Sequence, residues 1–574
     1  MRKLSRPIVT ACSVLMLAIT THASTDLTPA LTILLKPAAA DARSHISSLD
    51  VTVTVAGPAV AAGQPLLRMA LVTSNVETVA NTLEQLTATD SAGPLPLTST
   101  DDPEGGAAFY RHWHAARATS GVIVVHYRAP ISETLAPRGA APPLELRSDT
   151  GAFSGKGETF LMLPERDLPW RSAIRWDLSE MGPGAVGVSS LGLGNVSPAD
   201  ATGTMTLASS FFMAGEIHVY PQVPPATGFF AAWYGKPPYD LEPVMASEQK
   251  LYEFYERFFK RPSTAPYGVF MRENLVNAGG GVSLGNTSFV TTFGPKTDLD
   301  ELKITLAHEM LHTFVGGLDD RGDDSWYAEG LAVYYARLLA LRANQITPDQ
   351  FLSDLNSTAG RYYTDLLIHT PNSEIAPNFW ADTRIRVLPY DRGSMYFGVV
   401  DGEVRAASNG TQSLDDLVLA MLERRRNRLP AGEAAWREQL KAHLGDNGIT
   451  EFDAMLAGAI MLPQSKGFGP CFARTSKPLR RYQLGFEPRV LIEQKRIVRG
   501  LIPGSAAETA GVRNGDEITK PVPQDMIQGQ QDAILTLELL RDGKPLKISY
   551  LPRGETVDAY QWTRIEAVSS PCAY

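Results

Sequence analysis

The sequence predicts a multidomain α+β protein with a β-rich N-terminal part, a mainly helical middle and a β-rich C-terminal end. Its 574 residues are more than one hydrophobic core accommodates, so several domains are expected. Apolar and polar residues alternate with the period of strands in the first part and follow helical spacing from about residue 297. After about residue 470 the pattern returns to short strands separated by turns.

The first residues have the pattern of an export signal. Basic residues within the first six positions precede an apolar stretch that ends near Ile19, and Thr21-His22-Ala23 favours cleavage after Ala23. We therefore predict a signal peptide at residues 1–23 and an exported protein, either periplasmic or secreted. No later stretch is long and apolar enough for an integral membrane span. The formal net charge of −9 argues against nucleic acid as a partner.

Residues 24–168 are predicted to form a β-sandwich domain. The segments Asp50–Gly57, Gly121–Pro130 and Glu158–Leu163 are β-rich, and Pro- and Gly-rich turns separate the strands. A sheet with one apolar face must cover that face with a second layer, which favours a sandwich. A boundary is expected near Pro164–Trp176, so the second domain is predicted to span residues 169–470.

The second domain is predicted to be mainly helical beyond Thr297. Thr297 and Asp300 resemble a capping box, and Gly316-Gly317 would end the helix that they start at about Val315. The other expected helices are Ser247–Phe259, Tyr327–Ala343, Gly393–Ala407 and, after a Ser413/Asp416 start, Leu414–Arg426.

Residues 471–574 are predicted to form a third domain, and two cysteines lie at its ends. Removal of the signal peptide leaves Cys471 and Cys572 as the cysteines of the chain. In an oxidising compartment such a pair tends to be bridged. We predict this disulfide, which would join the two ends of the last domain.

The pentad HEMLH, from His308 to His312, is the signature of a helical zinc site. Residues four apart lie on the same helix face, so both imidazoles can bind one ion. Glu309, next to the first histidine, can act as general base toward a water molecule at the metal. The alternative is two surface histidines on an amphipathic helix. We predict one Zn²⁺ ion per chain at His308 and His312.

A catalytic zinc ion also needs a third protein ligand and an open position. The candidates are the loop acids Asp319, Asp320, Asp323 and Asp324, and Glu329. Four acids in a glycine-containing loop are equally typical of a solvated turn. Glu329 instead lies in a mostly apolar helical segment, where a carboxylate is costly unless it has a partner. A zinc ion would be that partner, so we favour Glu329.

A hydrolase of this kind needs a donor for the oxyanion that forms on the attacked carbonyl group. Tyr390, in the segment VLPYDRGSMYF, precedes the predicted helix start at Gly393, where a loop side chain could face a cleft. The alternative is an ordinary half-buried tyrosine, and composition does not select this residue.

These motifs together resemble a known family. HEMLH, a glutamate within WYAEGLAVYY and the downstream PYDRG resemble gluzincin aminopeptidases. With the segment Arg175–Gly194, the glycine run NAGGGVSLGNTS and the C-terminal unit, the chain resembles the PDZ-containing glycyl aminopeptidase family. The resemblance covers nearly the whole mature chain. It implies a thermolysin-like, mainly helical catalytic domain at residues 169–470 and a PDZ domain at residues 471–574.

The resemblance implies roles for the residues of the zinc site. His308, His312 and Glu329 would bind zinc, Glu309 would be the general base, and Tyr390 would stabilise the transition state.

The resemblance also implies two substrate-binding segments. Gly279, Gly280, Gly281 and Val282 would belong to the strand along which substrate lies. In the C-terminal unit, Ile497–Ile518 is similar to the strand, turn and helix of bacterial PDZ domains. Such domains bind peptide ends by adding a strand to a sheet edge. The carboxylate-binding loop would consist of Leu484, Gly485 and Phe486.

The glycine run departs from the family pattern in one respect. In related aminopeptidases it leads into a glutamate that anchors the free amine of the substrate. Here Val282, Ser283 and Leu284 follow, with no acid nearby. The amine would need another acid, such as Asp319 or Asp324, or the enzyme would cleave internally.

We therefore expect an exported zinc metallopeptidase that acts on peptide or protein substrates. An aminopeptidase for small N-terminal residues is favoured, with a C-terminal peptide as ligand of the PDZ domain, and an endopeptidase is the alternative. A third hypothesis is a non-catalytic PDZ peptide-binding or quality-control protein in which zinc is only structural. Glu309 and Tyr390 argue against it, because a structural zinc site needs neither.

Overall fold

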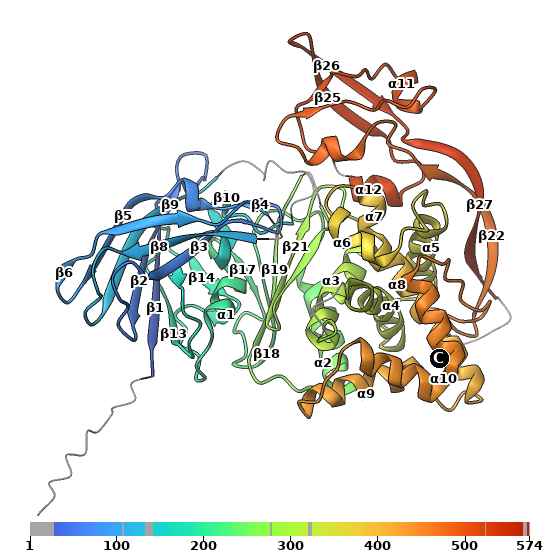
Figure 1. The fold of residues 1–574 in the computed structure, drawn as a ribbon, viewed down its shortest axis with the longest axis horizontal. Helices are drawn as coiled ribbons and strands as arrows, with labels where there is room; N and C mark the ends of the chain where they lie inside the picture. The colour runs from blue at the N-terminus through green and yellow to red at the C-terminus, as the bar shows by residue number, and fades with distance from the viewer. Residues whose placement is uncertain are drawn as a thin grey trace, which may run out of the picture.

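The computed structural model describes residues 28–105, 108–132, 142–275, 278–319, 324–522, 524–565 and 571–572. The predicted signal peptide, residues 1–23, lies outside this part of the chain. β-sheets of the N-terminal part, a central sheet and a helical part follow one another from left to right in Figure 1, and the C-terminal unit lies above the helices.

Two sheets of the N-terminal part share one apolar core, as the predicted sandwich requires. Buried Ile33, Val53, Met69 and Trp113 belong to this core, and the strands of Ile33 and Val53 alternate buried and more exposed residues. The first sheet has the order β13-β1-β2-β9-β5-β6, with β13 Arg171–Trp176, β1 Ala30–Pro37, β2 Ser48–Ala56, β9 Ile123–Pro130, β5 Glu84–Asp90 and β6 Gly93–Pro94. The second has the order β12-β3-β8-β7, with β12 Leu163–Pro164, β3 Pro65–Thr73, β8 Ala108–Ala115, β7 Leu97–Asp101 and, beside β3, β4 Val76–Glu77.

The N-terminal part extends beyond the boundary that we expected at residue 168. Strand β13 pairs in parallel with β1, so Ile174 lies opposite Ile33. The short helix α1, Thr204–Ser209, also packs its Leu207 into the sandwich core. The pairing joins segments more than a hundred residues apart, which local sequence patterns do not reveal.

A third N-terminal sheet packs on the central sheet. Phe211 of the former and Phe270 of the latter lie with ring centroids 5.2 Å apart in a common buried cluster. The third sheet has the order β10-β11-β16-β14-β15, with β10 Arg147–Asp149, β11 Ala152–Lys156, β16 Phe211–Gly215, β14 Val186–Ser189 and β15 Gly192–Leu193. The central sheet has the order β17-β18-β19-β21-β20, with β17 His218–Tyr220, β18 Gly228–Trp233, β19 Pro266–Glu273, β21 Ser288–Phe293 and β20 Gly281–Leu284.

A buried ion pair also joins these two sheets. Arg272 of β19 is fully buried, and its Nη2 atom lies 2.7 Å from Oε2 of Glu145. The same guanidinium group donates to the hydroxyl group of Ser154 in β11. The pair therefore ties the N-terminal part to the sheet that carries the glycine run.

Helices cover the other face of the central sheet (Figure 1). The longer ones are α2 Glu242–Phe258, α3 Leu299–Val315, α4 Ser325–Arg342, α5 Pro348–Tyr363, α8 Leu388–Ala407, α9 Leu414–Arg426 and α10 Glu433–Leu456, with the short α6 Ile375–Asn378 and α7 Thr383–Arg386 between α5 and α8. The expected bounds of α9 are confirmed, including its Ser413/Asp416 capping box. The start expected for α8 was wrong, because this helix begins at Leu388 instead of Gly393.

The C-terminal unit begins with a strand that packs on the helical part. Strand β22, Phe472–Tyr482, pairs with β27, Arg553–Arg564, and this ribbon lies along α5. Cys471 and Cys572 form a disulfide beside it, in the core of the helical part. A separate core begins only at Tyr482, about ten residues beyond the expected boundary.

The remainder of the unit is a small sheet with short helices. Its strand order is β23-β24-β25-β26, with β23 Arg496–Ile497, β24 Glu517–Ile518, β25 Leu535–Arg541 and β26 Lys544–Tyr550. Helices α11, Ala506–Thr509, and α12, Gln524–Gly529, pack beside it.

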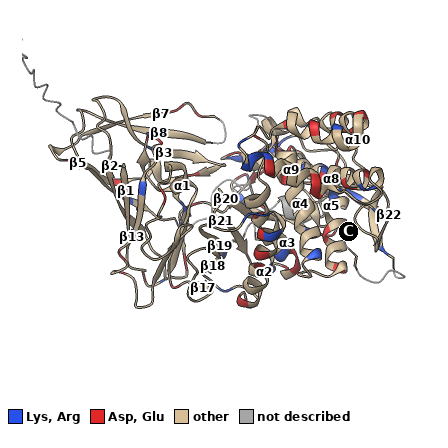
Figure 2. Ribbon diagram, turned by 90° about the horizontal axis from the view of Figure 1, so that it is seen from below, with Lys and Arg blue, Asp and Glu red and all other residues tan. Residues whose placement is uncertain are grey.

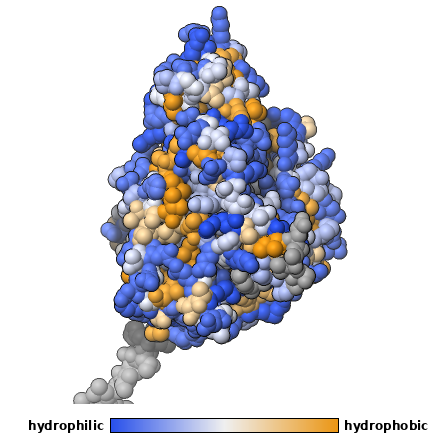
Figure 3. Space-filling view, turned by 90° about the vertical axis from the view of Figure 1, so that its right-hand side faces the viewer, coloured by the Kyte–Doolittle hydropathy of each residue, from blue (hydrophilic) through white to orange (hydrophobic). Residues whose placement is uncertain are grey.

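The helical part presents an interspersed charged surface. Figure 2 shows acidic and basic residues side by side on its helices, and the basic run of α9 is paired, since Arg424 bonds to Glu438 and Arg426 to Glu423. Figure 3 shows a mostly hydrophilic face with small separate hydrophobic patches. Among the helices of the described residues, none combines the length and apolar character needed to cross a bilayer.

Candidate metal centre

Helix α3 presents the two histidines of the pentad on one face. Its first turn is capped by Asp298, whose carboxylate accepts hydrogen bonds from the amides of Asp300 and Glu301. It ends at Gly316, where φ is +58° and glycine is favoured. The Nε2 atoms of His308 and His312 lie 3.2 Å apart.

Helix α4 brings Glu329 to these histidines. Its Oε2 atom lies 3.3 Å from Nε2 of His308 and 3.2 Å from Nε2 of His312. The three ligand atoms lie within 4.8 Å of one another, as a metal site requires.

The loop acids have other partners. Asp319 pairs with Arg425 and accepts a hydrogen bond from the amide of Ala431. Asp324 accepts one from the amide of Leu318. Asp320 and Asp323 lie outside the described residues. Asp319 and Asp324 thus stabilise the loop, and the candidate metal site among the described residues consists of His308, His312 and Glu329.

The three residues fit a zinc ion. Glu329 Oε2 is buried without a hydrogen bond, although two imidazole nitrogens face it. Ligands on a tetrahedral ion with bonds of about 2.0–2.1 Å lie roughly 3.3 Å apart, which matches the observed separations. Imidazole nitrogen and carboxylate oxygen are also donors that zinc prefers. An ion at this position would give the buried oxygen its partner.

The residues of the centre shift each other's pKa values. Burial alone would lower the pKa of His312, but the Glu329 carboxylate raises it to about 9. Burial opposes ionisation of Glu329, yet His312 and His308 hold its pKa well below its usual range. Burial raises the pKa of Glu309, against the effect of both histidines. Glu309 is therefore a stronger base than an exposed glutamate.

Glu309 lies against the edge strand β20. A Cβ atom on Gly281 would lie 2.7 Å from Cγ and 2.8 Å from Oε1 of Glu309, so only glycine leaves room for this side chain. The backbone of Ser283 also lies close enough to the Glu309 carboxylate to oppose the rise of its pKa. The close approach fixes the carboxylate between the helix and the strand.

The glycine run forms a turn and then the outermost strand of the central sheet. Gly279 has a φ of +82° and lies in the turn, and its amide donates to Thr292. The amide of Thr292 in turn donates to Gly280. Val282 belongs to β20 and packs on the cluster between the sheets. The run thus places an edge strand beside Glu309.

Tyr390 lies in the first turn of α8, not in a loop as expected. Its ring is 6.0 Å from the ring of His308, centroid to centroid, at an interplanar angle of 21°. Its half-buried side chain therefore lies beside His308, one of the three candidate ligands.

Two glycines that the sequence does not mark as functional set the positions of α4 and α8. A Cβ atom on Gly330 would lie 2.6 Å from the Cα atom of Gly393. Gly330 follows Glu329, and Gly393 lies one turn after Tyr390. The contact between these two helices was not predicted from the sequence. The glycine that follows Glu329 and the glycine of PYDRG were the only features of the sequence that indicated it.

The LGFE segment of the C-terminal unit is part of that unit's core. Leu484 and Phe486 are buried, and Gly485, with a φ of +93°, packs closely against Ala507. The following Pro488–Ile492 form a 3-10 helix. The segment directly after the loop therefore offers no strand to which a peptide could add.

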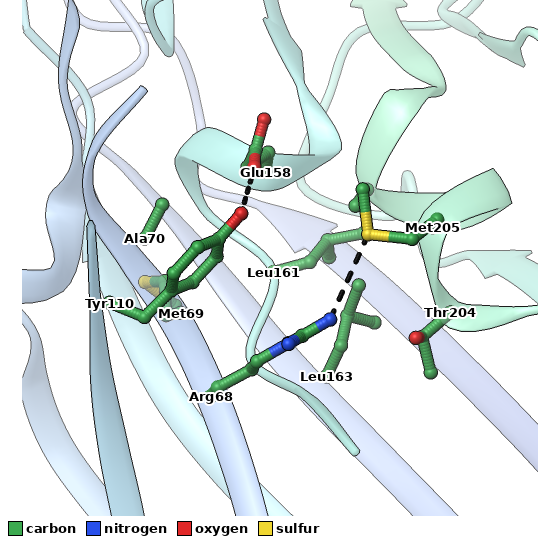
Figure 4. A pocket seen from close by; sticks show the side chains of 10 residues that line it. Arg68, Met69, Ala70, Tyr110, Glu158, Leu161, Leu163, Thr204 and Met205 are labelled. Carbon is green, nitrogen blue, oxygen red and sulfur yellow. Dashed lines mark hydrogen bonds between the residues drawn. The ribbon is translucent and has the colours of Figure 1, made fainter. Parts of the chain in front are cut away.

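A small cavity in the N-terminal part is not a second candidate site (Figure 4). Its volume of about 20 Å³ has room for roughly one water molecule. Glu158 at its wall already accepts hydrogen bonds from Thr73 and Tyr110 and pairs with Lys156. Arg68 lies over the Tyr110 ring.

The fold is similar to that of a solved aminopeptidase N family protein. An aminopeptidase N family protein from Idiomarina loihiensis matches with a TM-score of 0.65 over 93% of this chain and 98% of that chain, at 14% identity. An M1 zinc metallopeptidase from Deinococcus radiodurans matches with a TM-score of 0.47 over 76% and 95%, at 14% identity. Yeast LTA4 hydrolase matches with a TM-score of 0.43 over 75% and 68%, at 12% identity. No family model and no curated protein matches the sequence.

Proposed function

We propose that this chain is an exported zinc metallopeptidase, and that it removes small residues from the N-termini of peptides or proteins. The observation that carries the proposal is the convergence of His308, His312 and Glu329, with Glu309 beside them. The similarity of the whole fold to an aminopeptidase N family protein supports it at the level of architecture.

His308, His312 and Glu329 would bind one zinc ion. A bound zinc ion supplies Lewis-acid polarisation of the scissile carbonyl group and lowers the pKa of the attacking water. Glu309 would accept the proton of that water, and its burial favours this role by raising the pKa of the carboxyl group. Tyr390 would donate a hydrogen bond to the developing oxyanion.

The edge strand β20 is the proposed position for the substrate backbone. A peptide could pair with the outer edge of Gly281-Val282, next to Glu309, in the manner of an added strand. Gly281 matters here because a larger residue would displace the base.

Membership of the PDZ-containing glycyl aminopeptidase family remains part of this proposal. It rests on the motifs PYDRG and NAGGGVSLGNTS and on the C-terminal unit. Peptide binding by that unit would have to use another edge than the segment after Leu484–Phe486, because that segment is a 3-10 helix. The Cys471–Cys572 disulfide supports export, since such bonds persist in oxidising compartments.

An endopeptidase is the second candidate. It is favoured by the absence of an acid after the glycine run and by the other partners of Asp319 and Asp324. An N-terminal ammonium group needs a carboxylate to be held, whereas an internal peptide bond does not.

Mass spectrometry of a peptide pool separates the two. Half of the pool is N-acetylated, and the zinc-loaded protein is incubated with it in the presence and absence of a chelator. Loss of single residues from free peptides only, abolished by the chelator, establishes an aminopeptidase. Cleavage inside both halves establishes an endopeptidase, and no cleavage contradicts a peptidase function.

A further inference from the structure

The segment Tyr390-Asp391-Arg392-Gly393 begins in the first turn of α8, which directly follows the short helix α7. Within the described residues, α8 has no side-chain cap at Val387. The contacts of the residues that follow Tyr390 also contribute to holding it beside His308.

The residue after Tyr390 supplies such an interaction. Asp391 is fully buried, and its carboxylate forms two hydrogen bonds with Arg361 of α5, of 2.7 Å from Nε and 2.5 Å from Nη2. A bidentate arginine–carboxylate pair restricts both distance and orientation. It therefore fixes the first turn of α8 relative to α5.

The Arg361 side chain is itself enclosed. Only 22% of its side chain is exposed. Gly529 of α12 lies against it, since a Cβ atom there would be 3.8 Å from Nη1 of Arg361. Screening by solvent is weak in such a place, so the two charges attract each other more strongly than at the surface, and the loss of one partner is costly.

The next two residues hold the same turn from other sides. Arg392 is buried and donates to the side chain of Asn372 and to the carbonyl groups of Ile368 and Thr370. Gly393 packs against α4 at Gly330. Each residue after Tyr390 therefore contacts a different element around the centre.

We infer that Arg361 and Asp391 are positioning residues, whose bidentate pair holds the first turn of α8 so that Tyr390 stays beside His308 in the orientation that the reaction needs. The inference rests on the role of Tyr390 in the proposed function. The pair acts through Tyr390 and does not itself contact substrate.

The test compares Arg361→Lys, Asp391→Asn and Tyr390→Phe in the full-length, zinc-loaded protein. Arg361→Lys keeps the charge but loses the bidentate geometry. A misplacement of about 1 Å can cost roughly a hundredfold in rate, so we expect kcat to fall by about 10–100-fold with KM within about twofold. A phosphinate peptide, whose tetrahedral centre mimics the transition state, should lose affinity in parallel with kcat.

A double-mutant cycle identifies the route of the effect. If Arg361 acts through Tyr390, then Arg361→Lys in a Tyr390→Phe background changes kcat by less than about twofold. If the effects of the two substitutions on kcat multiply in the double variant, the positioning role is overturned. A change in KM alone overturns it as well. An unimpaired Tyr390→Phe variant would instead overturn the assignment of Tyr390 in the proposed function.

Arg405→Ala is the matched control. Arg405 pairs with buried Asp401 at 2.8 Å on the same helix, several turns away from Tyr390. Its loss should lower the melting temperature but leave kcat of the folded protein unchanged. Equal losses of kcat in Arg405→Ala and Arg361→Lys would show that the loss comes from lower stability of the protein as a whole. This result would overturn the inference.

Discussion

Gly330 and Gly393 lie in direct contact where α4 crosses α8. A Cβ atom on Gly330 would lie 2.6 Å from Gly393, and one on Gly393 would lie 2.5 Å from the carbonyl oxygen of Trp326. One helix carries Glu329 and the other carries Tyr390, each within one turn of its glycine. The crossing therefore sets the distance between two residues of the candidate site.

The first prediction is that Gly330→Ala weakens both stability and zinc binding. The added methyl group overlaps backbone atoms, so the helices must separate, at a cost of about 1–3 kcal/mol. We expect a lower melting temperature and a higher zinc dissociation constant, measured by calorimetry and chelator competition. Gly402→Ala on α8 is the control, because its nearest contact would be an ordinary 3.6 Å to Gln464. Equal behaviour of the two variants would contradict the importance of the crossing.

The second prediction concerns the contact of Gly281 with Glu309. In Gly281→Ala the methyl group would lie 2.7 Å from Cγ of Glu309 and must displace the carboxylate. We expect kcat to fall by about 10²-fold or more, as for other misplaced catalytic groups. Zinc content, measured by atomic absorption, should remain at that of the parent protein, because the ligands are not touched. A kcat equal to that of the parent would show that strand β20 moves aside and that the Glu309 carboxylate stays in place.

The third prediction tests the proposed role of Glu309 as general base. Glu309→Gln keeps the shape of the side chain and removes its ability to accept a proton, so we expect turnover to fall by about 10²–10⁴-fold. Zinc should still bind, because Glu309 is not among the three ligands. Peptide hydrolysis and zinc content are measured on the same preparation. Activity close to that of the parent would remove Glu309 from the mechanism.

The fourth prediction is a pH-dependent stability caused by Glu248. This residue is buried in α2, its Oε2 atom has no hydrogen bond, and burial raises its pKa from 4.5 to about 8. Between these pH values the folded state keeps a proton that the unfolded state has lost. The free energy of unfolding therefore falls with rising pH by about 1.4 kcal/mol per unit, and the contribution is complete below pH 4.5 and lost by about pH 8.

Glu248→Gln should remove this contribution. We expect its melting temperature to exceed that of the parent at pH 8 and to approach it at pH 4. Glu253→Gln, at an exposed position of the same helix, should leave the pH profile unchanged. Parallel profiles of the parent and Glu248→Gln would exclude Glu248 as the cause.

The fifth prediction concerns the ion pair between the sheets. Glu145→Ala leaves the fully buried Arg272 without its carboxylate, which costs about 3–5 kcal/mol in comparable cases. We expect a clear fall in the urea midpoint of unfolding. Glu438→Ala removes the partner of Arg424 at the surface, where 63% of the Glu438 side chain is exposed, and should cost at most about 1 kcal/mol. A similar small effect in both variants would contradict the role of the buried pair.

Local patterns predicted much of the helical part. The capping box at Ser413 marked the start of α9. Gly316 marked the end of α3, but the cap expected at Thr297 was wrong, because Asp298 caps this helix. The start of α8 escaped detection, because Pro389 and the charged pair Asp391-Arg392 read as a loop. In the structure each of these charges is neutralised or bonded by a distant segment.

The sequence by itself determined which residue types could form the centre: two histidines on one helix face, a neighbouring base and a carboxylate in an apolar helix. Only the tertiary structure decided that Asp319 and Asp324 stabilise their loop while Glu329 faces the histidines. Only it placed Gly281 against Glu309, joined β13 to β1 and formed a 3-10 helix after Gly485. Periodicity and capping are encoded by neighbouring residues, whereas these contacts depend on packing between segments far apart in the chain.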